Sequence, residues 1–176
     1  MFPMGYKNQT PAKHKVFVSY HHGGDQPYYD AFSKAFHDTY DVIYDNSLER
    51  VVDSEDVEYV MRRIRESYIA GSSCTIVLIG AKTWGRKYVD WEIKATLDKE
   101  HGLIGVHLPS AARDPKTNGI LVPDRLFDNI QSGFSPWLSW QEITSSAAQL
   151  HAYIADAKSR STKLIVNNRD RRLRNA

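Results

Sequence analysis

Residues 72–98 place the strongest constraint on the fold of this chain. They begin with a β-branched apolar run, Cys74 to Ile79, whose length and composition are typical of a strand buried on both faces. Gly80 ends this run, and a helix-like stretch begins about five residues later. A strand that is buried on both faces needs helices on both sides of its sheet, so this stretch predicts an α/β fold.

The same alternation of short apolar runs and amphipathic stretches recurs along the chain. It predicts strands at 16–20, 41–45, 74–79 and 103–107, and helices at 27–39, 54–71, 84–100 and 145–158. Strands that alternate with helices favour a parallel sheet, so we expect a three-layer α/β sandwich of four to five strands in flavodoxin-like order. Segment 109–133 is expected to be a long loop of the kind that forms lids, and 134–140 a short edge strand because of Pro136.

The domain organisation follows from length and composition. We expect a flexible N-terminal arm over 1–14, one domain over 15–160 and a basic C-terminal tail over 161–176, whose residues 169–174 are solvated and mobile. With 41% hydrophobic and 25% charged residues, the composition is that of a globular protein. The net charge of +2 does not favour nucleic acid or a membrane as partner. A single cysteine, Cys74 in the middle of a strand, gives no disulfide framework and indicates a cytoplasmic protein.

Flavodoxin-like order predicts where a binding site lies. Ligands of such sheets bind at the carboxyl ends of the strands, where the strand order reverses, and here the first and third strands end there. The residues expected at that edge are Ser19, Tyr20, His21, Asp45, Asn46 and Gly80 to Trp84. Glu92 follows Tyr88 by four residues and Trp84 by eight, which places all three on one helical face. Taken alone, this pattern also fits core aromatic residues and a solvated or ion-paired glutamate.

Several kinds of site are absent from the sequence. There is no Gly-x-Gly-x-x-Gly fingerprint and no phosphate-binding loop with Gly-Lys-Ser/Thr. No set of histidine, cysteine and carboxylate residues has the spacing of metal ligands, and Ser19 has no partners in the order of a hydrolytic triad. We therefore expect neither a metal nor a bound cofactor.

Four segments resemble one protein family. The run 16–20, Val-Phe-Val-Ser-Tyr, resembles the opening strand of TIR domains, and 87–93 resembles the aromatic-x-x-x-Glu helix of TIR enzymes, with Tyr88 in the aromatic position. The runs 53–58 and 71–80 are similar to a narrower branch, the bacterial TIR-like family that includes the TIR subunit of Thoeris anti-phage defence. The resemblance covers roughly residues 14–108.

This resemblance implies an activity. TIR enzymes of this kind cleave NAD+ at the nicotinamide–ribose bond with the helical glutamate, which corresponds to Glu92, so NAD+ is a substrate and not a cofactor. Ser19, Tyr20, His21, Asp45, Asn46, Gly80, Trp84 and Tyr88 are the expected substrate contacts. The expected product is a cyclic or conjugated ADP-ribose that a separate effector protein reads, and the enzyme is expected to self-associate into a homo-oligomer. The alternative is a TIR interaction module that self-associates without catalysis.

Overall fold

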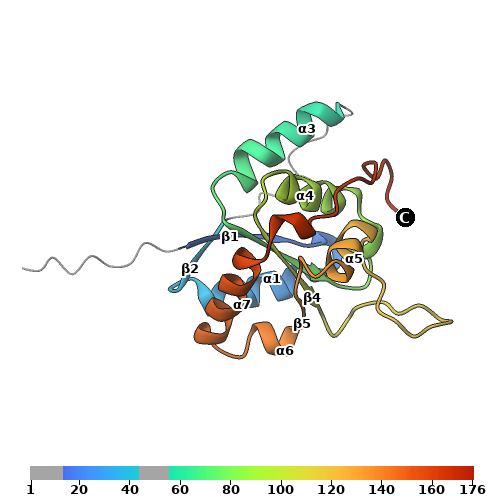
Figure 1. Cartoon of the computed structure of the whole chain (residues 1–176). Coiled ribbons are helices and arrows are strands. Elements are labelled where there is room, and N and C mark those ends of the chain that lie inside the picture. Colours follow the sequence, from blue (N-terminus) through green and yellow to red (C-terminus); the bar gives the residue numbers. More distant parts are fainter. Residues whose placement is uncertain (1–13, 44–55) are drawn as a thin grey trace, which may run out of the picture.

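A parallel sheet of five strands forms the middle layer of the protein, in a computed structural model that describes residues 14–43 and 56–176 (Figure 1). The strand order is β2-β1-β3-β4-β5, and every neighbouring pair is parallel. The strands are β1 (His14–Ser19), β2 (Tyr40–Ile43), β3 (Cys74–Ile79), β4 (Gly102–His107) and β5 (Trp137–Ser139). The predicted flavodoxin-like order is confirmed, and so is the edge strand after Pro136.

Helices cover both faces of this sheet, as predicted (Figure 1). One face carries α1 (His22–Phe36), α6 (Trp140–Ile143) and α7 (Ala147–Ser159). The other face carries α3 (Val57–Arg63), its π-helical continuation η1 (Ile64–Ile69), α4 (Lys87–Asp98) and α5 (Asp124–Gln131). Two short 3-10 helices, η2 (Thr83–Gly85) and η3 (Thr162–Leu164), complete the described elements. Within residues 14–43 and 56–176, every helix is too short or too polar to cross a bilayer.

The side chains of β1 alternate between the two faces of the sheet, so each helical layer packs against a different set of them. Val16 and Val18 pack in the cluster under α1 and α7, whereas Phe17 packs in the cluster under α3 and α4. Successive side chains of a strand point to opposite faces, so Ser19 shares the α4 face with Phe17, and Tyr20 shares the α1 face with Val18. Ser19 and Tyr20, which were predicted to contact the same substrate, therefore lie on opposite faces of the sheet.

Helix α1 begins earlier than the sequence predicts. The helix was predicted to begin at residue 27, but it starts at His22 and contains Pro27 in its interior. Its buried side chains are Asp25, Tyr29, Phe32 and Phe36, which lie on one face at helical spacing. Packing of this face against the sheet outweighs the poor helix propensity of Gly23 and Gly24.

Two further expectations are wrong. Segment 109–133 is a loop only in its first part, because 124–131 forms α5 and buries Leu126 in the core. The basic tail 161–176 packs against the domain, although its residues 169–174 were expected to be solvated and mobile. Its residues 165–176, which we call the strap, run across α5 and α4 to the turn before α4 (Figure 1). Of the expected N-terminal arm, residues 1–13 lie outside the described residues, and His14 already belongs to β1.

Candidate functional site

A buried carboxylate from α4 meets the end of β1 at the carboxyl edge of the sheet. Glu92 is 5% exposed, Ser19 is fully buried, and the Ser19 hydroxyl donates a hydrogen bond to Glu92 Oε2. One turn further along α4, Thr96 Oγ1 donates to the Glu92 carbonyl oxygen at 2.9 Å and lies 2.7 Å from Thr75 Oγ1 in β3. These contacts fix α4 to the two strands whose ends form the predicted switch point.

A second carboxylate reaches the same edge from the opposite face, and the sequence analysis missed it. Asp25 in α1 is 2% exposed, and the Thr83 hydroxyl donates to its Oδ2 at 3.2 Å. Burial raises the pKa of Asp25, whereas the hydrogen bond from Thr83 and the charge of His21 act to lower it. Asp25 precedes Tyr29 by four residues, so a helix that starts at His22 would have placed it on the buried stripe.

The turn after β3 is built around Asp25. The backbone N–H of Gly80 donates to Thr83 Oγ1 at 2.9 Å, which closes the turn that joins β3 to η2. A Cβ atom at position 80 would lie 2.1 Å from Asp25 Oδ1, so no side chain fits there. Gly80, which was predicted as a substrate contact, therefore lies directly against a buried carboxylate.

Tyr20 lies in the core and not at an open edge. Its side chain is 4% exposed, and its ring stacks on Tyr29 with 4.6 Å between centroids. Its hydroxyl donates to Gln26 Oε1 at 3.1 Å. His21 is 8% exposed, and its imidazole lies so close to Gly23 that a Cβ there would be 2.9 Å from Nε2. This packing favours a role for Tyr20 in the core and not the predicted contact with substrate.

Trp84 and Tyr88, the two aromatic residues predicted to contact substrate, differ in their surroundings. Trp84 lies in η2, before α4 begins, and is partly exposed. Tyr88 lies in the first turn of α4, packs edge-on against Trp91 with 5.4 Å between centroids, and borders the core cluster under α3. Tyr88 and Glu92 do share a face of α4. Trp84 does not belong to that helix, because it lies in the turn that precedes it. Asp45 and Asn46, also predicted for the site, lie outside the described residues.

Comparison with known proteins identifies the family. Residues 17–113, more than half of the chain, match the family model described as Thoeris protein ThsB, TIR-like domain. The chain belongs to this family. It is also 30% identical over 115 residues to a protein of Bacillus cereus (strain MSX-D12) named "Putative cyclic ADP-D-ribose synthase ThsB1". That match covers 63% of this chain and 52% of the relative, so the chain spans about half the length of the curated relative.

In this TIR-like domain, the side of α4 that faces away from Glu92 holds a buried ion pair. Arg125 of α5 is 1% exposed, and its Nε donates to Asp90 Oδ1 at 2.9 Å. Asp90 and Glu92 are two residues apart on a helix, so they point about 200° apart around its axis. The ion pair therefore joins α4 to α5 and leaves the sheet side of α4 to Glu92.

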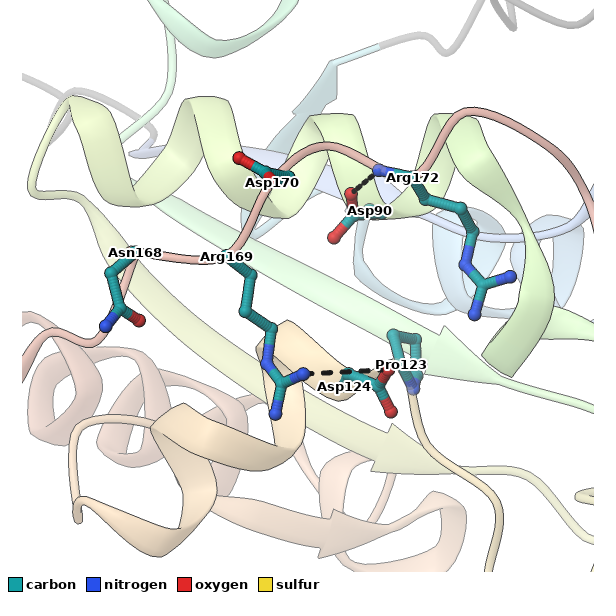
Figure 2. A pocket seen from close by; sticks show the side chains of 7 residues that line it. All are labelled: Asp90, Pro123, Asp124, Asn168, Arg169, Asp170 and Arg172. Atoms are coloured by element: carbon teal, nitrogen blue, oxygen red, sulfur yellow. Dashed lines mark hydrogen bonds and ion pairs between the residues drawn. The ribbon is translucent and has the colours of Figure 1, made fainter.

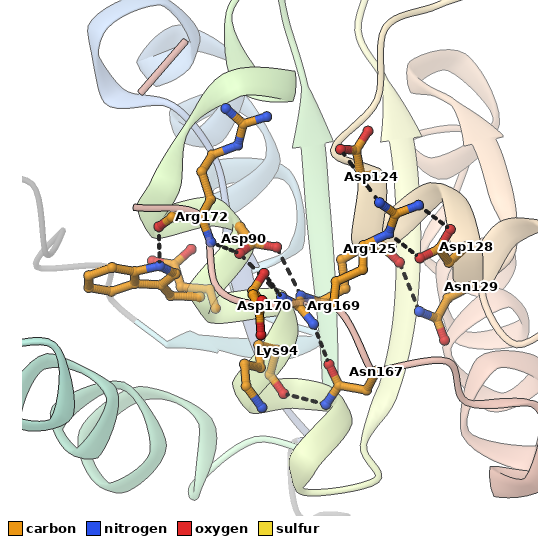
Figure 3. A network of polar contacts seen from close by, with 12 residues as sticks. Asp90, Lys94, Asp124, Arg125, Asp128, Asn129, Asn167, Arg169, Asp170 and Arg172 are labelled. Carbon is orange, nitrogen blue, oxygen red and sulfur yellow. Dashed lines mark hydrogen bonds and ion pairs between the residues drawn. The ribbon is translucent and has the colours of Figure 1, made fainter. Parts of the chain in front are cut away.

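The strap lies over this ion pair (Figure 3). The backbone N–H of Arg172 donates to Asp90 Oδ2 at 2.8 Å, and its carbonyl oxygen accepts from the Trp91 indole N–H at 2.8 Å. Asn129 of α5 forms two hydrogen bonds with the backbone of Val166, at 2.7 and 3.0 Å. The strap ends at the turn before α4, where the N–H of Ala176 donates to the Gly85 carbonyl oxygen at 2.9 Å.

A polar pocket opens between the strap and α4 in this ThsB-family domain. Its volume is about 470 Å³, and its lining residues are Asp90, Pro123, Asp124, Asn168, Arg169, Asp170 and Arg172 (Figure 2). An ion pair of 3.9 Å joins Arg169 to Asp124 at its wall. Because Asp90 belongs to this pocket, the pocket lies on the strap side of α4, separate from the Ser19–Glu92 pair.

Proposed function

We propose that this TIR-like domain cleaves the nicotinamide–ribose bond of NAD+ with Glu92 as the catalytic carboxylate, and releases a cyclic or conjugated ADP-ribose. The observation that carries the proposal is the buried Ser19–Glu92 pair at the carboxyl edge of β1. The Bacillus cereus relative carries the name "Putative cyclic ADP-D-ribose synthase ThsB1", which supports the same reaction class.

The chemistry suits a single carboxylate. When the C1′–N bond breaks, its electron pair leaves with nicotinamide, which departs as a neutral molecule, so no general acid is required. The ribosyl group that remains is oxocarbenium-like and electron-poor at C1′. A negative charge held nearby stabilises that transition state, and a buried site strengthens the interaction because little water screens it. The Ser19 hydroxyl holds the Glu92 carboxylate in one orientation before substrate arrives.

The product depends on which nucleophile reaches C1′. Attack by water gives linear ADP-ribose, whereas attack by a nucleophile of the same ADP-ribosyl unit closes a ring. An internal nucleophile is already positioned, so it is favoured where water is excluded. Our proposal is the second outcome, with the nucleotide acting as a signal in anti-phage defence.

Assembly, partner and compartment belong to the same proposal. The domain self-associates into a homo-oligomer in the cytoplasm, where NAD+ is available, and a separate effector protein responds to the released nucleotide. If self-association completes the site, specific activity rises with protein concentration. A dilution series, analysed by light scattering and by nicotinamide release, measures this directly.

The test is a comparison of three proteins incubated with NAD+, with nicotinamide and the nucleotide products separated by chromatography and identified by mass. Glu92→Gln keeps the shape of the side chain but removes its charge, and we expect a loss of about two orders of magnitude or more. Glu66→Gln is the matched control, because Glu66 is exposed on the neighbouring η1. Turnover by Glu92→Gln at the parent rate contradicts the assignment. No nicotinamide at any protein concentration favours the non-catalytic interaction module.

A further inference from the structure

Asp25 occupies a position where a carboxylate is costly. The other buried side chains of α1 are the aromatic residues Tyr29, Phe32 and Phe36, and Asp25 continues their stripe at the end nearest the carboxyl edge of the sheet. Burying a charged group without compensation is strongly destabilising, so such a group needs hydrogen bonds in its folded environment. Outside α1, the hydroxyl of Thr83 donates a hydrogen bond to Asp25.

The direction of the hydrogen bonds at Thr83 is fixed. A threonine hydroxyl has one proton to donate and lone pairs to accept. Its oxygen accepts from the Gly80 N–H at 2.9 Å, and its proton goes to Asp25 Oδ2, with 3.2 Å between the oxygens. Asp25, Thr83 and the Gly80 amide therefore form a relay in which the carboxylate orients the hydroxyl, and the hydroxyl holds the turn.

This relay lies at the junction that places the candidate catalytic helix. β3 ends at Ile79, Trp84 lies in η2 directly after Thr83, and α4, which carries Glu92, begins at Lys87. The absence of a Cβ at Gly80 lets the Asp25 carboxylate approach the turn from the α1 side. Ser19 holds Glu92 from the end of β1, and the relay fixes the path by which the chain reaches the same helix.

We propose that Asp25 is a positioning residue for the reaction at Glu92, and that it acts through Thr83 to set the turn that carries Trp84 into the site. Asp25 takes no part in bond making or breaking. This inference rests on the proposed NAD+ cleavage, and it adds that the reaction needs a second buried carboxylate on the opposite face of the sheet.

The decisive variant is Thr83→Val, which keeps the shape of the side chain and removes the hydroxyl. We expect faster hydrogen exchange at the Gly80 amide and a fall of about 10-fold or more in kcat/KM for NAD+, the scale of a lost hydrogen bond to a charged group. Thr83→Ser restores the hydroxyl and is expected to recover most of both. Thr39→Val, at an exposed threonine after α1, is the control. A fluorescence melt shows what fraction of each variant is folded.

The outcomes separate the two proposals. Unchanged exchange at Gly80 in Thr83→Val overturns the relay. Faster exchange with an unchanged kcat/KM also overturns it, since the turn then has no role in the reaction. A fall in activity that merely follows the folded fraction, with no recovery in Thr83→Ser, overturns it as well. If the parent protein releases no nicotinamide, the proposed function fails, and the exchange comparison still decides whether the relay holds the turn.

Discussion

The Ser19 hydroxyl donates a hydrogen bond to the Glu92 carboxylate across 73 positions of sequence, and both side chains are buried. Removing the donor leaves the carboxylate in place but frees its orientation. We therefore expect Ser19→Ala to lower kcat/KM for NAD+ by about 10-fold, with most of the loss in kcat. Nicotinamide release under saturating and limiting NAD+ measures the two parameters. Ser67→Ala, at an exposed serine of η1, should match the parent, and equal activity in Ser19→Ala contradicts the role of the pair.

Asp25 should make the stability of the protein depend on pH. Burial raises its pKa above the ordinary value of 3.8, so the folded state holds the proton at pH values where the unfolded chain has lost it. Stability from this group is present below the unfolded pKa and is lost as the pH rises through the raised folded pKa. Asp25→Asn removes this dependence. Urea unfolding between about pH 4 and pH 7 should show the difference in stability between variant and parent shifting in favour of the variant as pH rises, and parallel curves contradict the prediction.

Tyr20 and Trp84 should respond differently to truncation. Tyr20 is 4% exposed and stacked in the core, so Tyr20→Ala should cost about 3–5 kcal/mol of unfolding free energy, as for other buried aromatic residues. Trp84 is partly exposed in η2, and Trp84→Ala should lower NAD+ turnover while changing the melting midpoint much less. Thermal melts and activity of both variants provide the measurement. The assignment is wrong if Trp84→Ala is the variant that unfolds.

Breaking the buried ion pair between Asp90 and Arg125 should strongly lower the free energy of unfolding. Asp90→Ala leaves the fully buried guanidinium of Arg125 without its carboxylate and also removes the acceptor for Arg172 N–H. We expect a loss of about 3–5 kcal/mol in unfolding free energy. Asp124→Ala is the matched control, because that carboxylate is largely exposed and 3.9 Å from Arg169, and its loss should stay within about 0.5 kcal/mol. Similar losses in the two variants would contradict the prediction.

The sequence predicted the sheet because its strands are short continuous apolar runs. The alternation with helices predicted a parallel sheet, and the flavodoxin-like order chosen for it brought Ser19 to the edge where Glu92 was expected. Helix α5 was missed because two of its buried residues, Arg125 and Asn129, are polar and interrupt the apolar pattern. Asp25 was missed because Gly23 and Gly24 suggested a loop before a helix that would begin at Pro27, and no local pattern reveals that the Asp25 carboxylate reaches across to Gly80.

The strap could not be predicted for a different reason. Its contacts with α4 use the backbone N–H and carbonyl of Arg172, which any residue type supplies, and its partner atoms lie 81 and 82 positions earlier in the chain. Composition indicated a solvated basic segment, since charged side chains usually stay in water. The backbone of the same segment is nevertheless held by hydrogen bonds to α4, and the character of the side chains does not predict such bonds.

That separation in sequence sets an order of events during synthesis. At about 5–20 residues per second, Trp91 is made roughly 4–16 s before Arg172. For that interval the indole N–H of Trp91 and the second oxygen of Asp90 have no strap to meet, although β1, β2 and β3 are already made. A nascent chain therefore presents this side of α4 uncovered to chaperones and to neighbouring chains on the same messenger until the strap has been made.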